Sequence, residues 1–387
     1  MFRPAALALL VVYASAVGFA QSRSGPPSPD TIQPISRGEY AGDQACAGCH
    51  RDKAQAYRKT AHFLSSTQVD AGALAGKLTQ PSVTLKTGNP RVSFRIDTRA
   101  NGYFQTGTID GPPAPQVTTA RIDLATGSGR KGNTYLSWQK DALYQLPVSY
   151  WTTPGRWINS PGFVDGRADF TRSITPRCLE CHATYARPVA PPNRYVRDET
   201  ILGITCEKCH GPGRDHVGHR GPAKSPSIDT IINPKRLTRE RQIELCETCH
   251  AGTALQSRTR PFTYRPGRPL TTYYTRPPAS RDPVVEVHAN QIALLARSEC
   301  FEGSQMTCST CHDVHATERS VAALSTRCLT CHKAEAHKPV PNAPANLRAG
   351  CVDCHMPNQK SNALVLTTLG GGSTLQPQVR THWIKVY

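Results

Sequence analysis

Long apolar segments are nearly absent from this chain of 387 residues. One apolar run extends from Ala5 to Val17, after Arg3 and before the small residues Gly18 and Ala20. A positive charge, a short apolar core and small residues in this order are typical of a secretory signal peptide, and the run is too short for a stable membrane span. We therefore expect a protein exported to the periplasm or the cell exterior; the alternative is a retained membrane anchor.

Acidic residues are also scarce, because 28 Asp and Glu stand against 46 Lys and Arg, for a formal net charge of +18. Such an excess ordinarily favours nucleic acid or an anionic membrane surface as a partner.

Cysteines outside a repeated motif are scarcer still. Fourteen of the 15 cysteines lie in one repeated motif, which leaves Cys300 without a partner for an internal disulfide. We interpret Cys300 as a small buried apolar residue.

The repeated motif is C-x-x-C-H, and it occurs seven times. One helical turn brings its two cysteines to the same edge, where both sulfurs can form thioethers with one haem while the histidine ligates the iron. Zinc also binds C-x-x-C pairs, but a zinc site gives no reason for a histidine after every second cysteine. The sequence therefore predicts seven covalently attached haem c groups. From site 1 to site 7, the attachment residues are Cys46 and Cys49, Cys178 and Cys181, Cys206 and Cys209, Cys246 and Cys249, Cys308 and Cys311, Cys328 and Cys331, and Cys351 and Cys354.

The predicted proximal iron ligands, in the same order, are His50, His182, His210, His250, His312, His332 and His355. Since each haem carries two propionates, seven haems offset roughly 7 positive charges when oxidised and roughly 14 when reduced. Many lysines and arginines are therefore interpreted as propionate partners, and nucleic acid is not expected as a partner.

Seven further histidines lie outside the motifs, which favours ligation of each iron by two histidines, an arrangement suited to electron transfer. His219 follows His216 by three residues and is interpreted as exposed; if it is no ligand, one haem lacks a sixth protein ligand and is open to a small substrate. No C-x-x-C-K variant occurs. The predicted distal ligands are His62, His216, His288, His315, His337 and His382.

The spacing of the motifs divides the chain into unequal parts. A long segment without cysteine follows site 1, and its alternating residues at 92–97, 103–106, 121–126, 135–139 and 143–151 predict antiparallel strands. We expect a multihaem cytochrome c fold of mainly short α-helices and loops around stacked haems, with a small antiparallel β insert. The expected parts are a signal peptide (1–20), a flexible leader (21–40), a haem 1 segment (41–79), a β-rich insert (80–170) and a hexahaem domain (171–387).

Several phrases carry a resemblance to a known superfamily. They are GSGRKGNTYL (127–136), LYQLPVSYW (143–151), SPGF (160–163), ITCEKCHGPGRDHV (204–217), the segment 288–300, CHDVH (311–315), CVDCHMP (351–357) and THWI (381–384). With them, residues 41–387 resemble the multihaem cytochrome c superfamily that includes the tetrahaem cytochrome c of ammonia oxidisers, hydroxylamine oxidoreductase and octahaem tetrathionate reductases. The chain is most similar to exported multihaem cytochromes that often carry tetratricopeptide repeats.

The resemblance implies distal-ligand roles for His216, His288, His315, His382 and His62. The resemblance offers no counterpart for His219. No repeat domain is expected, because the sequence ends soon after His382.

We expect an electron-transfer protein whose donor and acceptor are other redox proteins, with membrane contact only through a partner. One alternative is an oxidoreductase that acts on a small nitrogen or sulfur compound at one open haem, by analogy of fold alone. Another is a homo-oligomer, the subunit of an extracellular haem filament. Residues for catalysis are not predicted.

Overall fold

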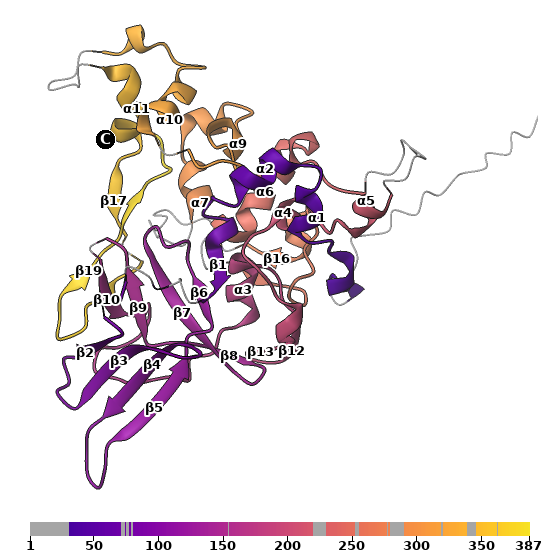
Figure 1. The fold of residues 1–387 in the computed structure, drawn as a ribbon. Coiled ribbons are helices and arrows are strands. Elements are labelled where there is room, and N and C mark those ends of the chain that lie inside the picture. Colours follow the sequence, from indigo (N-terminus) through magenta and orange to yellow (C-terminus); the bar gives the residue numbers. More distant parts are fainter. Residues whose placement is uncertain are drawn as a thin grey trace, which may run out of the picture.

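The structure, a computed structural model, describes residues 31–387 apart from 71–73, 75–76, 79, 154, 220–229, 252–254, 277, 279–289, 319, 339–345 and 362. Antiparallel sheets occupy one half of the molecule and short helices the other (Figure 1). The expectation of mainly short helices and loops with a small β insert is wrong, because the structure is rich in antiparallel sheets and only 28% of the residues are helical.

The helices are short. The α-helices in the described part are α1 (Asp43–Ala47), α2 (Arg51–Tyr57), α3 (Pro176–His182), α4 (Cys206–His210), α5 (Arg214–Gly218), α6 (Arg239–His250), α7 (Gln291–Leu295), α8 (Glu299–Glu302), α9 (Cys308–Cys311), α10 (Val321–Cys328) and α11 (Leu347–His355). Short 3-10 turns are η2 (Arg37–Glu39), η3 (Phe63–Ser65), η4 (Arg197–Glu199), η5 (Pro234–Arg236), η7 (Leu270–Thr272) and η8 (Ala334–Ala336).

Two sheets make up most of the β half. The four-stranded sheet has the order β2 (Ser82–Lys86), β3 (Val92–Arg99), β4 (Gly102–Ile109) and β5 (Gln116–Arg121). The larger sheet has the order β1 (Ser66–Gln68), β6 (Leu124–Thr126), β7 (Gly132–Gln139), β8 (Ala142–Gln145), β13 (Arg194–Tyr195) and β12 (Pro188–Ala190), and β7 also pairs with β9 (Val148–Trp151), which pairs with β10 (Arg156–Asn159). Two-stranded pairs are β11 (Ala183–Tyr185) with β14 (Ile201–Leu202), β15 (Gln256–Ser257) with β16 (Tyr274–Thr275), β17 (Asn358–Lys360) with β20 (Gln378–Arg380), and β18 (Leu366–Thr367) with β19 (Thr374–Leu375).

Strands predicted from alternating residues are confirmed in both large sheets. In β3, Phe94 and Ile96 are buried while Arg95 between them points to solvent, as a half-buried strand requires. The sheets exceed the prediction because they also recruit segments of two to four residues, such as β1, β12 and β13. Segments this short have too few residues for alternation to reveal them.

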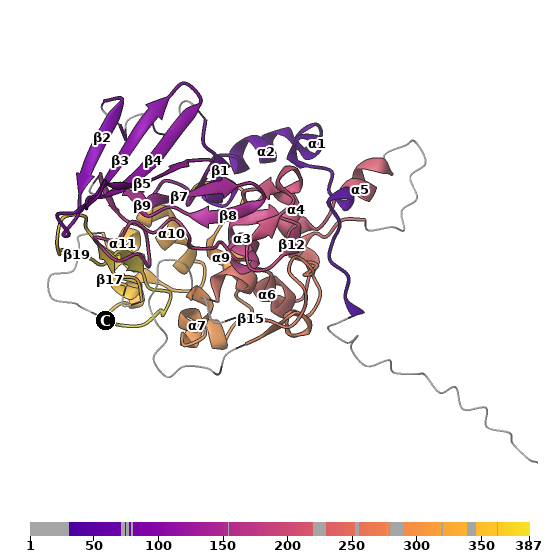
Figure 2. The same cartoon turned by 90° about the horizontal axis from the view of Figure 1, so that it is seen from below.

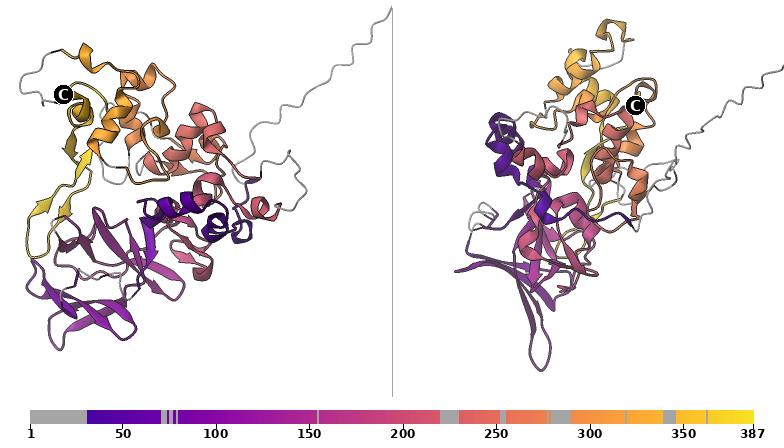
Figure 3. Two further views of the ribbon diagram at one scale, coloured as in Figure 1. Left: turned by 45° about the horizontal axis from the view of Figure 1, so that its top comes forward. Right: turned by 90° about the vertical axis from the view of Figure 1, so that its right-hand side faces the viewer.

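The C-terminal segment returns to the sheets. Its strands, drawn in yellow, run from the helical half to the β half (Figures 1 and 3). An antiparallel bridge joins Thr368 to Ile158 of β10, and Asn159 donates its side-chain amide to the carbonyl oxygens of Thr367 and Thr368, at 3.3 Å each. Residues more than 200 positions apart are thereby held together, so the C-terminal segment is fixed against the β half.

The β half buries its apolar residues in two clusters. One cluster lies between the large sheets and contains Phe94, Ile96 and Tyr135. A second cluster joins the larger sheet to α3 through Leu143 and Leu179. From below, the motif-bearing helices lie beside these sheets (Figure 2). The β half thus has a conventional core and provides a rigid wall for the helices.

One buried glutamine connects the two large sheets. Gln105 of β4 has no solvent exposure; its side chain donates to the Val148 carbonyl oxygen (2.7 Å) and accepts from the Val148 amide (3.1 Å). The amide side chain therefore substitutes for a strand neighbour, satisfying both backbone groups of a residue in the other sheet.

We predict that Gln105→Ala lowers the free energy of unfolding by about 2–4 kcal/mol, because two buried backbone groups lose their partners. Chemical denaturation followed by circular dichroism measures the change. Gln116→Ala on the exposed edge of β5 is the matched control and should change stability by less than about 0.5 kcal/mol. Equal stability of the two variants would contradict the prediction.

Candidate functional site

The helical half surrounds one large cavity of about 3340 Å³. An ordinary small-molecule pocket measures about 300–1,000 Å³, so this cavity has room for several large ligands. All seven motif histidines line this cavity, together with thirteen of the fourteen motif cysteines. Cys354 is the one motif cysteine outside the lining. The seven predicted attachment sites therefore open into one shared space.

Each motif is built on a single helical turn. The amide of His50 donates to the Cys46 carbonyl (2.9 Å), and the same bond closes sites 5 and 6, where His312 and His332 donate to the first cysteine of their motifs at 3.0 Å. This turn places the two cysteines and the histidine along one edge, as thioether attachment and axial ligation require.

Four motif histidines face a second histidine ring in the described part of the chain. The ring centroids are separated by 6.0 Å for His250 and His62, 6.0 Å for His210 and His315, 6.3 Å for His312 and His382, and 6.1 Å for His355 and His337. Every pair combines one motif histidine with one histidine from outside the motifs. Sites 4, 3, 5 and 7 are therefore the four that the structure pairs.

The common separation has a simple physical meaning. An imidazole nitrogen lies about 2 Å from a metal ion that it ligates, so two ligands on opposite sides hold their nitrogens about 4 Å apart and their ring centroids about 6 Å apart. The four pairs share this separation and also their composition, one motif histidine and one histidine from outside the motifs. The pairs therefore fit one iron atom each, and the residues present fit covalently attached haem.

Hydrogen bonds at Nδ1 leave the other ring nitrogen, Nε2, for the metal. Nδ1 of His210 lies 2.8 Å from the Ile232 carbonyl oxygen, and Nδ1 of His355 lies 2.9 Å from that of Lys385. At site 2, Nδ1 of His182 lies 3.2 Å from the Ser65 carbonyl. Such partners fix the orientation of a ligating ring and its tautomer.

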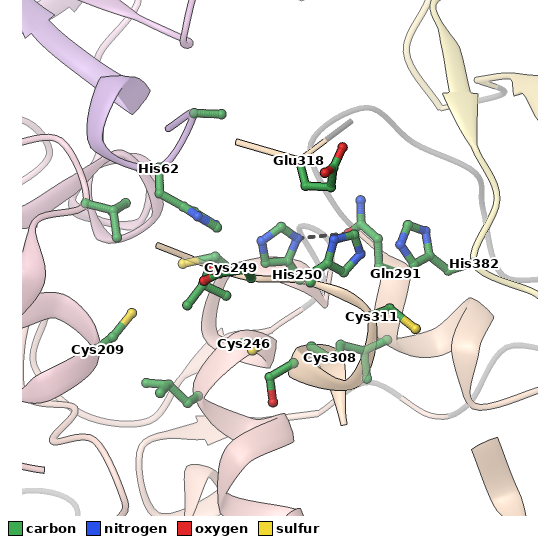
Figure 4. Close-up of a pocket in the computed structure, with 18 of the residues that line it drawn as sticks. His62, Cys209, Cys246, Cys249, His250, Gln291, Cys308, Cys311, Glu318 and His382 are labelled. Atoms are coloured by element: carbon green, nitrogen blue, oxygen red, sulfur yellow. Dashed lines mark hydrogen bonds between the residues drawn. The ribbon is translucent and has the colours of Figure 1, made fainter. Parts of the chain in front are cut away.

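His250 has a different kind of partner. Its Nδ1 lies 3.0 Å from Oε1 of Gln291, a side-chain amide on α7 (Figure 4). The close-up also shows His62 directed toward His250 from the opposite side of the cavity.

Burial lowers the pKa of two predicted distal histidines and so favours the neutral form that metal ligation requires. Burial lowers the pKa of His382 to about 4, and His312 opposite contributes in the same direction. Burial likewise lowers the pKa of His62, followed by the effect of His250. Nδ1 of His382 is buried without a hydrogen-bond partner among the described protein atoms. A buried unpaired nitrogen is unfavourable, and it would be satisfied only if a metal ion were bound through this nitrogen.

The other candidate histidines differ in placement. His216 lines the cavity from α5, whereas His219, the uncertain candidate, is exposed and bonded through Nδ1 to the Asp215 carbonyl at 2.7 Å. His288 lies outside the described residues. Cys300, predicted to be buried, is partly exposed and lines the cavity near Cys311 and Cys328.

Cysteines of different motifs approach one another. Cys46 of site 1 is adjacent to Cys206 of site 3, within hydrogen-bonding reach, and this neighbour together with burial raises the pKa of the Cys46 thiol. The same contact joins sites 2 and 4 through Cys181 and Cys249, and sites 4 and 5 through Cys246 and Cys308. Three pairs of attachment edges therefore meet inside the cavity, while none of the fifteen cysteines forms a disulfide.

Three motifs contain a buried glutamate between their cysteines, a feature that the sequence reasoning missed. At site 3, the carboxylate of Glu207 is 2% exposed and accepts hydrogen bonds from the amides of Ala41 (2.8 Å), Gly42 (2.9 Å) and Gly213 (2.8 Å). Glu207 therefore joins the residues just before site 1, the motif of site 3 and the turn before α5, the helix that carries His216.

The glutamates of sites 2 and 4 hold a second segment. Glu180 accepts from the Phe262 amide (3.0 Å) and the Tyr274 hydroxyl (3.1 Å), and Glu247 receives two bonds from Arg276, at 2.6 and 2.7 Å. A usable signal was present in the sequence, because Glu recurs between the cysteines of these motifs, where a charge has no role in thioether chemistry.

The C-terminal segment completes two sites at once. It carries His382, which faces His312 of site 5, and the Lys385 carbonyl that lies against His355 of site 7. The buried hydroxyl of Ser298 accepts from the Ile384 amide at 2.8 Å and holds this segment in place. One stretch of four residues thus connects neighbouring sites.

Comparison with known proteins gives one match. Residues 155–211, which contain sites 2 and 3, match the family model described as Cytochrome c554 and c-prime. The match supports a cytochrome c family. It implies covalently bound haem c and electron transfer, and it is consistent with an exported protein. No curated protein and no solved structure matches the chain.

Two further observations concern the described residues. They contain no helix that is both long and apolar enough to cross a bilayer. They also contain no group of three or more His, Cys, Asp or Glu side chains arranged to hold a metal ion among themselves. The facing histidine pairs are arrangements in this part of the chain that could each hold one iron atom between two rings.

We predict that Glu207→Ala lowers the free energy of unfolding by about 2–5 kcal/mol, because three backbone amides lose a charged acceptor. Chemical denaturation monitored through haem absorbance measures the loss. Glu240→Ala on the exposed side of α6 is the control and should change stability by less than about 1 kcal/mol, since its pairing with Arg241 is a surface interaction. An unperturbed Glu207→Ala protein would contradict a structural role for this carboxylate.

Proposed function

We propose that this chain is an exported heptahaem c-type cytochrome that carries electrons along a chain of haems ligated mostly by two histidines. The single observation that carries the proposal is the set of four histidine pairs at 6.0–6.3 Å, arranged around one cavity with the seven motifs. Bound haem supplies one-electron redox chemistry at iron, and the chain supplies attachment, ligand identity and spacing.

The proposed ligand sets follow from the pairs. His62 serves site 4, and the distal ligands of sites 3, 5 and 7 are His315, His382 and His337. We assign His216 to site 1, because Glu207 holds the turn before α5 against the residues that precede Cys46. His288 remains a proposed distal ligand for one of the two other sites.

The proposed electron route follows the adjacent cysteines. Sites 1 and 3, 2 and 4, and 4 and 5 share contacts between their attachment edges. In the C-terminal part, α10 and α11 pack together, and their motifs supply sites 6 and 7. Since tunnelling rates fall steeply with distance, edges in contact favour transfer between these neighbours. The donor and acceptor are proposed to be redox proteins.

Mass spectrometry of the purified holoprotein tests the number of cofactors. We expect the processed chain plus the mass of seven haems, and a low-spin spectrum from the paired sites. A colourless protein, or one with the mass of the bare chain, would refute the proposal. Carbon monoxide binding to the reduced protein at one haem per chain would instead favour the oxidoreductase alternative.

Removal of one distal ligand provides the second test. We predict that His382→Ala converts one haem of seven from low spin to high spin and allows carbon monoxide to bind there, because the iron of site 5 loses its sixth ligand. Electron paramagnetic resonance and the carbon monoxide difference spectrum measure the change. His219→Ala is the matched control and should leave both spectra unchanged; conversion in the control but not in His382→Ala would reverse these assignments.

A further inference from the structure

Site 4 occupies a central position among the sites. Its cysteines contact those of two other sites, since Cys249 lies beside Cys181 of site 2 and Cys246 beside Cys308 of site 5. Helix α6, which carries the motif of site 4, also packs against α3 of site 2 and α9 of site 5. A haem iron held by His250 and His62 would therefore lie at the junction between site 2 and site 5, and its potential would affect transfer in both directions.

The proximal ligand of this junction is held in an unusual way. Of the four motif histidines that have an Nδ1 partner near a hydrogen-bonding distance in the described chain, His182, His210 and His355 use a backbone carbonyl, and His250 alone uses a side chain, Gln291. With Nε2 bound to an iron, Nδ1 would carry the proton and donate to Oε1 of the amide.

The backbone beside Gln291 is shaped for this contact. Asn290, directly before α7, has φ +120°, a conformation that residues other than glycine rarely adopt. Its amide lies 3.3 Å from the His250 carbonyl oxygen, so residues 290 and 291 contact both the backbone and the ring of His250. A strained conformation of this kind persists where the surroundings hold it, and it is found most often at functional sites.

We propose that Gln291 is a positioning residue that orients the His250 ring and lowers the potential of the site 4 haem. A hydrogen bond from Nδ1 to an acceptor increases the basicity of the ligating nitrogen, which stabilises oxidised iron more than reduced iron. This inference rests on the proposed function, because it requires a haem at site 4. It differs from that function in naming the residue that sets the potential at the junction.

Two substitutions at residue 291 test the inference in opposite directions. Gln291→Leu keeps the size of the side chain and removes the acceptor, so one of the one-electron steps should move to higher potential. A tenfold change in the redox equilibrium corresponds to about 59 mV, which is the shift expected from loss of such a partner. Gln291→Glu introduces a stronger acceptor and should move the same step to lower potential. Spectroelectrochemical titration of the holoprotein measures both.

Gln116→Leu is the matched control. Gln116 lies on the exposed edge of β5 and is not among the residues that line the cavity. The reduction potentials of the haems in this variant should equal those of the parent protein. A purely structural role for Gln291 would alter stability in both of its variants without moving one step in opposite directions.

The outcomes separate the two proposals. If the variants carry seven haems with low-spin spectra and the potentials do not move, the role of Gln291 is refuted while the proposed function stands. If the parent protein itself lacks the haems, the proposed function fails first. Gln291→Leu could lose the haem of site 4, and the potential of Gln291→Glu then provides the test. A potential lower than that of the parent protein supports the inference, and an unchanged potential overturns it.

Discussion

Two imidazole rings facing each other across about 6 Å are the constraint on which the helical half depends. A ring pair at this separation leaves room for one iron atom and no room for error of more than a fraction of a bond length. The partners come from distant parts of the chain: His62 and His250, or His312 and His382. Holding them requires fixed backbones on both sides, which short helices with few apolar contacts do not supply alone.

The rigidity comes from two sources. The β half provides a packed wall with its own core, connected across its sheets by Gln105 and closed by the C-terminal strands. Inside the helical half, buried carboxylates replace apolar packing. Glu180, Glu207 and Glu247 each tie a motif to a remote segment by at least two hydrogen bonds. Charged hydrogen bonds are directional, so they fix loops whose positions a hydrophobic contact would leave variable.

Much of the candidate site could be predicted from the sequence, because covalent attachment leaves a rigid local pattern. C-x-x-C-H predicts which residues attach a haem, and the structure brings all of these residues except Cys354 to the lining of one cavity. The pairing of distal ligands could not be predicted, since it depends on tertiary contacts such as that between His337 and His355, whose sequence spacing is uninformative. Gln291 was missed for the same reason: an amide has no signature that marks it as a partner of His250.

The fold was harder to predict than the site. Strands with clear alternation, such as β3 and β4, were predicted, whereas β12, β13 and β18 have two or three residues and gain their conformation only by pairing. The density of motifs after residue 171 suggested helices and loops throughout. It did not reveal that the end of the chain adds strands against β10, because that contact is a property of the assembled molecule.

The adjacent sulfurs of different motifs have a consequence for how the protein matures. Before haem is attached, Cys46 and Cys206, Cys181 and Cys249, and Cys246 and Cys308 present thiols at close range. An oxidising compartment favours disulfides between such neighbours, and each one would disable two attachment sites together. During maturation of the protein, thioether formation therefore competes with oxidation of the same thiols. A chain exported as proposed would have to meet its haems reduced and still unfolded, before the fold aligns the competing sulfurs.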